Sequence, residues 1–147
     1  MADADRDRLE PLRQLRRVEQ HVQADHLAGA LSEASSRQRA LAQASAAAGA
    51  AAHRADQAQE QLYALTASGT TAHVLALAAA YARRCRHALM HAEAERDRAV
   101  AQHDASDHAL SQARDLLAQA RARRQVIERY QERARQRQDR LRDRRAP

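Results

Sequence analysis

The 147-residue sequence contains no phenylalanine, tryptophan, lysine or asparagine, and it has a single isoleucine and a single cysteine. With only 15 leucines and five valines, it has too few bulky side chains to fill a compact core for this length, because the hydrophobic gain scales with buried apolar area. One cysteine excludes an internal disulfide. Only three glycines and two prolines interrupt the chain, so the composition favours long helices over a globular domain.

Alanine, the strongest helix former, supplies 38 residues, and its spacing is regular. Over 64 residues a mostly small side chain recurs at every seventh position, a series that we call the heptad seam: Ala78, Cys85, Ala92, Ala99, Ser106, Ala113, Ala120, Ile127, Ala134 and Leu141. A seven-residue repeat keeps one face of a helix against a partner helix. The seam therefore predicts a helix that packs closely along a second helix.

The helical pattern is interrupted once, at residues 66–71. Gly69 can adopt the left-handed conformation that ends a helix, and Ser68, Thr70 or Thr71 can cap the next one. Two long helices joined by a short turn must pack antiparallel. The predicted fold is all-α, an antiparallel coiled-coil hairpin with a frayed N-terminus at 1–8, helix one at 9–66, a turn at 67–71 and helix two at 72–145.

The first helix carries the complementary stripe of alanine and leucine from Leu27 to Leu65 at three- and four-residue spacing. A second, slightly shifted stripe precedes it and indicates a local stutter: Leu12, Leu15, Val18 and Val22. Pro11 is tolerated only in a first helical turn. Gly29 and Gly49 either allow close approach of the two helices or mark bends, and the sequence leaves both alternatives open.

The positive charge is concentrated at one end of the chain. Residues 121–147 contain 11 arginines and four acidic residues, whereas the rest of the chain is nearly neutral. With the turn centred near Ser68, residue i of helix one faces roughly residue 136 − i, so residues 126–147 are predicted to form a basic overhang about 30 Å long. Its apolar stripe lacks an internal partner and is flanked by arginines, which indicates a binding surface. The predicted partner-binding residues are Ile127, Arg129, Tyr130, Arg133, Arg137, Arg140 and Leu141.

The side chains that suggest chemistry have simpler structural explanations. His87, His91 and Glu95 follow the i, i+4, i+8 spacing of a metal site, but no fourth ligand is identifiable. Cys85 has no base held beside it and lies on the seam. The sequence contains no glycine-rich phosphate loop or nucleophile elbow. We expect no enzymatic activity, cofactor or metal.

Other binding functions are less favoured. The apolar run from Val74 to Ala82 is too short to cross a bilayer, and no signal peptide is recognisable, so a cytoplasmic location is expected. Arginine-rich helices also bind DNA, but this one is interrupted by Glu128, Glu132, Asp139 and Asp143. Asparagine, the usual adenine reader, is absent. Nucleic-acid binding remains a minor alternative.

The whole-chain layout resembles the FliJ/YscO family of cytoplasmic stalk proteins of type III secretion and flagellar export. The resemblance rests on the stripe Leu12-Arg13-Gln14-Leu15-Arg16-Arg17-Val18-Glu19, a mid-chain turn, and a longer second helix ending in the Arg/Gln/Glu-rich stretch from Arg129 to Gln138. These features extend over nearly all 147 residues.

The resemblance implies a non-enzymatic stalk that couples a hexameric export ATPase to the export gate, with secretion chaperones as further partners. It places the protein in the cytoplasm, with a peripheral position at the inner-membrane apparatus as an option. Arg129, Arg133, Arg137, Arg140 and Leu141 would then contact the ATPase, and residues near the turn such as Tyr63 and Leu77 would be free for a second partner. The alternative is a coiled-coil adaptor or dimerising scaffold.

Overall fold

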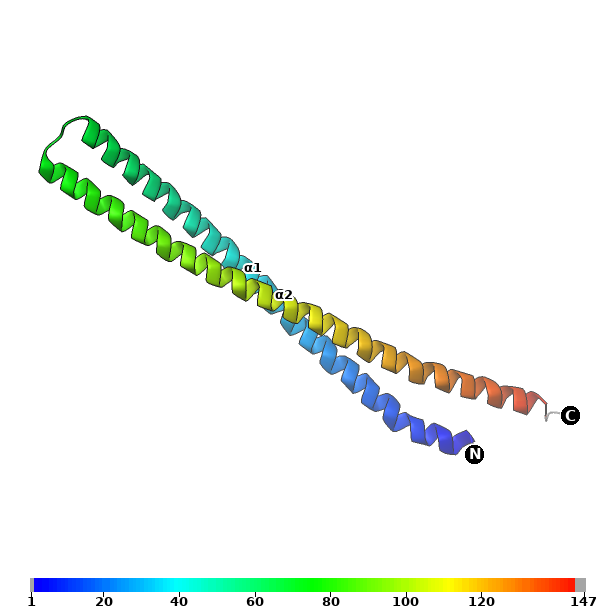
Figure 1. Ribbon diagram of the computed structural model, residues 1–147. Helices are drawn as coiled ribbons and strands as arrows, with labels where there is room; N and C mark the ends of the chain where they lie inside the picture. The colour runs from blue at the N-terminus through cyan, green and yellow to red at the C-terminus, as the bar shows by residue number, and fades with distance from the viewer. Residues whose placement is uncertain (1, 145–147) are drawn as a thin grey trace. The chain divides into compact units, whose positions relative to one another are not determined.

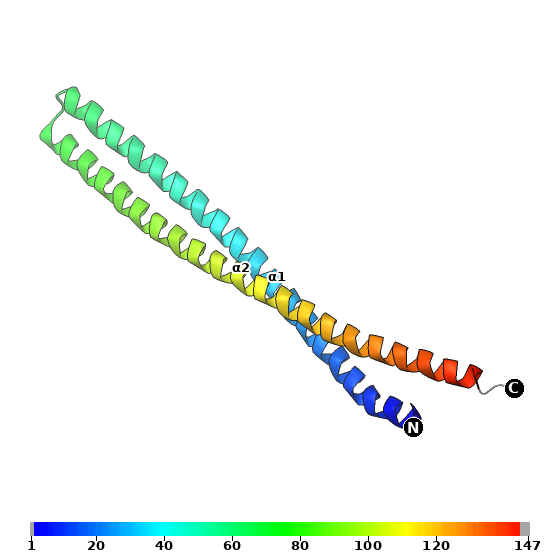
Figure 2. The ribbon, with the colours of Figure 1, turned by 45° about the vertical axis from the view of Figure 1, so that its right-hand side comes forward.

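The computed structural model describes the backbone of residues 2–144 and the side chains of residues 10–144. Two long helices account for nearly all of this part, α1 (Ala2–Ala67) and α2 (Ala72–Asp143), and it contains no strand. The helices pack against each other in opposite directions, as Figures 1 and 2 show. The prediction of an all-α antiparallel hairpin is therefore confirmed. Among the described helices, none has an apolar stretch long enough to span a membrane.

The turn lies at residues 68–71 and follows the predicted chemistry. Gly69 has a φ of +70°, the left-handed conformation that an L side chain adopts only with strain. The Ser68 backbone N–H donates to the Ala64 carbonyl at 3.0 Å, and its hydroxyl donates to the Leu65 carbonyl at the same distance. These bonds satisfy carbonyls at the end of α1, so the Ser68 side chain stabilises α1 and not the start of α2.

The chain divides into two compact units: unit 1 comprises residues 1–32 and 108–147, and unit 2 comprises residues 33–107. In unit 2 the two helices meet along small side chains. Ala48, Ala51, Ala58 and Ala82 are buried, and the heptad seam is half-buried from Ala78 to Ala99 and buried at Ser106. Long polar side chains join the helices at the flanks, where Arg37 donates to Gln102 at 2.7 Å and Arg86 donates to Gln59 at 3.0 Å.

In unit 1 the seam begins as predicted and then leaves the contact. Ala113 and Ala120 are at most 2% exposed, Ile127 is half-buried, and Ala134 and Leu141 are exposed. A straight α-helix drifts about 20° per heptad relative to a strict seven-residue repeat, so seam positions rotate away from the partner after a few heptads. The half-buried positions become those of Arg124, Gln131 and Gln138.

The start of α1 differs from the prediction. The segment expected to fray is helical from Ala2, and Pro11 lies inside the helix, not in its first turn. A proline there leaves one helical hydrogen bond unmade and crowds the preceding turn. Position 1 and residues 145–147, which include the predicted end of helix two at 145, lie outside the described residues.

The register also differs from the prediction. Glu19 was expected to lie level with residue 117, but it bonds to Arg123, and its neighbour Gln20 bonds to Arg124. In this register the first turns of α1 run level with the α2 segment that begins at Val126. The basic segment is therefore accompanied by α1 and is not the overhanging single helix that the sequence analysis predicted.

The glycines of α1 do not permit close approach of the helices. A Cβ atom built on Gly29 or on Gly49 would meet no other atom within 4 Å, and both residues are exposed. Each therefore weakens the helix through backbone entropy without a packing gain.

Candidate partner-binding surface

The contact between the helices of unit 1 is polar near the chain's N-terminus. Half-buried residues recur along α1 at the spacing of one helix face: Glu10, Arg13, Arg16, Glu19, Gln20 and Gln23. Two hydrogen bonds join them to α2. Arg123 Nη1 donates to Glu19 Oε1 at 2.8 Å, and Arg124 Nη1 donates to Gln20 Oε1 at 3.0 Å. This polar seam fixes which α2 residues lie beside each turn of α1.

Glu19 is the centre of the network. Its carboxylate accepts hydrogen bonds from Arg16 at 2.6 Å and from Arg123 at 2.8 Å. The bond from Arg16, followed by that from Arg123, lowers the pKa of Glu19, while partial burial opposes the shift. The side chain remains 27% exposed, so solvent screens the pairs. The Nε atoms of Arg13 and Arg16 are buried without a hydrogen-bond partner, which indicates that this seam is imperfectly satisfied.

Because polar residues occupy the seam between Glu10 and Gln23, the apolar stripe of this segment lies on the outer side of α1. Leu15, Val18 and Val22 are 58%, 60% and 54% exposed, and Leu12 at the edge of the stripe is 39% exposed. The sequence analysis predicted a local stutter here, but the half-buried positions continue at unbroken three- and four-residue spacing through Gln23, Gln20, Arg16 and Arg13. The stripe therefore faces solvent and does not take over the contact.

A second apolar stripe lies on α2 and contains three of the predicted partner-binding residues. Tyr130 and Leu141 are 62% and 57% exposed, and Ile127 is half-buried. The remaining predicted residues are also exposed and lie further round the same helix: Arg129, Arg133, Arg137 and Arg140. In the part of the chain with described side chains, none of these four arginines forms an ion pair.

The two apolar stripes come level with each other at Leu15 and Ile127. On a helix, residues three or four apart are neighbours on one face. Glu19 is therefore next to Leu15 and Val22, and Arg123 is next to Ile127. Because Glu19 bonds to Arg123, Leu15 lies level with Ile127, whereas Val22 lies on one side of this level and Tyr130 and Leu141 lie on the other. Val18 is two positions from the half-buried Arg16 and Gln20, so it points away from α2. We call the combined surface the apolar face: Leu15, Val18, Val22, Ile127, Tyr130 and Leu141.

The charge of the protein belongs to the same unit. Unit 1 contains 17 of the 25 arginines and 11 of the 19 acidic residues, whereas unit 2 contains eight of each. The formal net charge of +6 is therefore carried by unit 1 alone. An exposed apolar surface within a basic surrounding favours a partner that is acidic and partly apolar.

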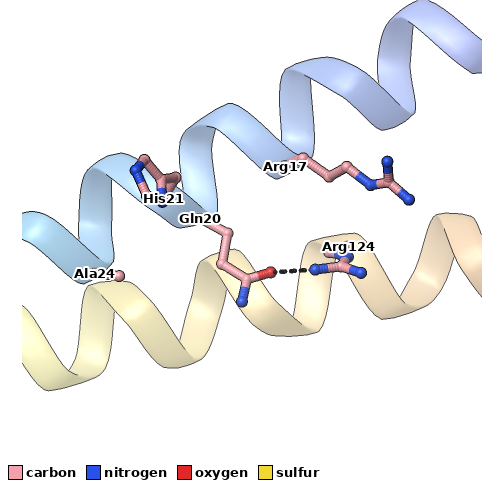
Figure 3. A pocket seen from close by; sticks show the side chains of 5 residues that line it. All are labelled: Arg17, Gln20, His21, Ala24 and Arg124. Atoms are coloured by element: carbon pink, nitrogen blue, oxygen red, sulfur yellow. Dashed lines mark hydrogen bonds between the residues drawn. The ribbon is translucent and has the colours of Figure 1, made fainter.

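A shallow cleft lies on another part of unit 1, lined by Arg17, Gln20, His21, Ala24 and Arg124. Figure 3 shows that Arg124 reaches it from α2 and that the other four residues come from α1, with the Gln20–Arg124 hydrogen bond across the cleft. Arg124 also donates to Glu128 at 2.7 Å. Its guanidinium is thus engaged within the chain, and its bond to Gln20 helps to align the two helices.

The other side chains with chemical potential lie in unit 2. Among the described residues, no three histidine, cysteine or acidic side chains are grouped to hold a metal ion, and His87, His91 and Glu95 are exposed. Cys85 is half-buried on the seam. Its hydrogen bond with Tyr81 raises the pKa of the Tyr81 hydroxyl, an interaction within one turn of α2.

Comparison with known proteins identifies no relative of this chain: no protein-family model, curated protein or solved structure matches it. The geometry of unit 1 is therefore the basis for a functional proposal.

Proposed function

We propose that the protein is a non-enzymatic coiled-coil stalk of a type III secretion or flagellar export apparatus, which couples a hexameric ATPase to the export gate. The observation that carries the proposal is the concentration of net charge and exposed apolar side chains in unit 1, which contains both helix ends remote from the turn. The resemblance of the chain layout to the FliJ/YscO stalk proteins supplies the identity of the partner.

A stalk that enters a protein ring needs a narrow end whose surface side chains can bind the inner wall of the ring. Unit 1 provides two antiparallel helices, and α2 carries exposed arginines that include Arg129, Arg133 and Arg137. Arginine binds carboxylates through several N–H donors, so an acidic ring lumen would hold this surface electrostatically. Such an interaction weakens as ionic strength rises, because exposed charges are screened.

The test is co-purification with the export ATPase of the same organism. Glutamine replacements at Arg129, Arg133, Arg137 and Arg140 should reduce recovery of the ATPase at least about tenfold if they remove more than 1.4 kcal/mol of binding. A matched control removes equal charge from exposed arginines of unit 2: Arg39, Arg54, Arg83 and Arg84. Failure of the unmodified protein to retain the ATPase, or equal loss in the control, would refute the proposal.

The alternative proposal is a coiled-coil adaptor or dimerising scaffold, and the exposed apolar face is the observation that favours it. Light scattering separates the two functions. A monomeric hairpin supports the stalk, while a dimer that survives dilution supports the scaffold. Near the turn, Tyr63 and Leu77 are 67% and 59% exposed and suit a second partner such as the gate or a secretion chaperone.

A further inference from the structure

We infer that the outer side of the last turns of α2 is a docking surface for an anionic lipid bilayer, on which α2 lies in the plane of the membrane. We call this surface the basic face, and its residues are Val126, Arg129, Tyr130, Arg133, Arg137, Arg140, Leu141 and Arg144. The inference goes beyond the proposed function, because it adds a ligand that is not a protein to the same end of α2. Its test contains no ATPase and does not depend on the proposed function.

The five arginines of the basic face form one row along α2. They follow one another at spacings of four, four, three and four residues, which places them on one side of a helix. All five are exposed. Gln131 and Gln138 are half-buried on the side of α1, and each lies two positions before an arginine of the row, so the row points away from α1. At about 1.5 Å per residue the row is about 22 Å long.

The acidic residues of this segment lie on a different side of α2. Their spacings of four, seven and four residues place them in a row of their own: Glu128, Glu132, Asp139 and Asp143. Glu128 accepts a hydrogen bond from Arg124 at 2.7 Å, and Glu132 accepts one from Gln136 at 3.3 Å. The basic face therefore contains no acidic side chain, and a surface of one charge sign over this length selects an extended anionic partner.

The apolar residues of the basic face favour a bilayer over other extended anions. Val126, Tyr130 and Leu141 are 66%, 62% and 57% exposed. Tyr130 is three positions before Arg133, and Leu141 is four positions after Arg137, so both lie beside the arginine row. Anionic headgroups bind arginines, and the layer beneath the headgroups takes up tyrosine rings and aliphatic side chains. Duplex nucleic acid offers phosphates without such an apolar layer.

The shape of the basic face also suits a bilayer. The face is the convex surface of a single helix, because all its residues belong to the end of α2 and point away from α1. A fluid lipid surface can contact such a ridge along its whole length, since its headgroups move to the arginines. A folded protein would need a groove of matching shape.

The experiment measures co-sedimentation of the full chain with vesicles of mixed phosphatidylglycerol and phosphatidylcholine, and with vesicles of phosphatidylcholine alone. Binding should require the anionic lipid and should weaken as the salt concentration rises, because surface charges are screened. Arg133→Gln with Arg137→Gln should lower the partition coefficient at least about tenfold, since each arginine near an anionic surface increases binding severalfold. Tyr130→Gln with Leu141→Gln should lower it at least about threefold, because apolar area then stays in water.

The matched control is Arg121→Gln with Arg135→Gln, which removes the same charge from exposed positions of the same helix. Arg135 is three positions after Glu132 and four positions before Asp139, so it lies on the acidic side of α2. This variant should lose at most about threefold in binding, because its missing charges are distant from the lipid and screened. Circular dichroism verifies that all three double variants remain helical, since glutamine is a good helix former.

Equal binding to the two kinds of vesicle, binding to neither, or equal losses in the Arg133/Arg137 variant and the control would overturn the inference. Unchanged vesicle binding in the Tyr130/Leu141 variant would also overturn it. Tighter binding to duplex DNA than to the anionic vesicles would assign the basic face to nucleic acid, and tighter binding to polyglutamate would assign it to an acidic protein. Either of these results overturns the inference.

Discussion

The same substitution, glycine to alanine, should have opposite effects at two positions of this hairpin. At Gly49 the added methyl group meets no atom within 4 Å and the backbone is helical, so Gly49→Ala should stabilise the protein by about 1 kcal/mol. At Gly69 the methyl group also meets open space, but the φ of +70° is left-handed. An alanine there costs about 1–2 kcal/mol, partly offset by about 0.4–1 kcal/mol from the stiffer unfolded chain.

The net expectation for Gly69→Ala is a loss of up to about 1.6 kcal/mol, with a middle value of about 0.8 kcal/mol. Urea denaturation followed by far-UV circular dichroism measures both free energies of unfolding under the same conditions. Gly29→Ala is the internal control, because Gly29 shares the open, helical surroundings of Gly49 and lies 20 residues away, so the two gains should add. A loss of stability in Gly49→Ala would show that the helices approach more closely than described and would refute the reasoning.

Three further changes test other parts of the structure. Ala113→Leu should destabilise the hairpin by about 1–3 kcal/mol, because Ala113 is 0% exposed and the larger side chain overpacks the contact. Thermal denaturation measures this against the control Ala101→Leu, at an exposed position. Equal melting temperatures of the two variants would argue against the described packing. Glu19→Gln should be less stable than the natural protein at neutral pH, and the difference in free energy of unfolding should close as the pH falls below the ordinary glutamate pKa of 4.5. The reason is that the lowered pKa of Glu19 stabilises the folded state only while the carboxylate is ionised. Denaturation at several pH values measures the difference, and a difference that stays constant with pH would contradict the prediction. Pro11→Ala should slow amide hydrogen exchange in the turns of α1 around it, because it restores a helical hydrogen bond, and unchanged exchange would exclude that origin of local weakness.

The hairpin was predictable because its determinants are local. Gly69 stands where a left-handed residue must end α1, and the alanines from Ala78 onward repeat with a period that only a paired helix uses. The exposure of Tyr130 and Leu141 was also correctly expected, but for the wrong reason. They are exposed because the seam rotates away from α1, and not because α1 ends before reaching them.

The apolar face was only half predictable. Its α2 residues continue a visible repeat, whereas the orientation of Leu15, Val18 and Val22 depends on which face of α1 the polar seam occupies. That choice is made by Glu19 and its partners on α2, and their pairing follows from a register that the turn alone left several residues uncertain. A long-range hydrogen bond between arginine and glutamate has no signature in the sequence. The orientation of the α1 residues of the apolar face therefore became apparent only from the register of the two helices in the structure.

The alanine contacts of this hairpin have a consequence for its alignment. Buried residues one heptad apart, such as Ala51 and Ala58 on α1 or Ala113 and Ala120 on α2, present nearly identical methyl groups, so displacing one helix along the other by a heptad would exchange one alanine for another. Shape alone therefore selects no unique offset. The offset is therefore set by a few hydrogen bonds between long polar side chains of the two helices. These bonds join Arg37 to Gln102 and Arg86 to Gln59 in unit 2, and Arg123 to Glu19 in unit 1.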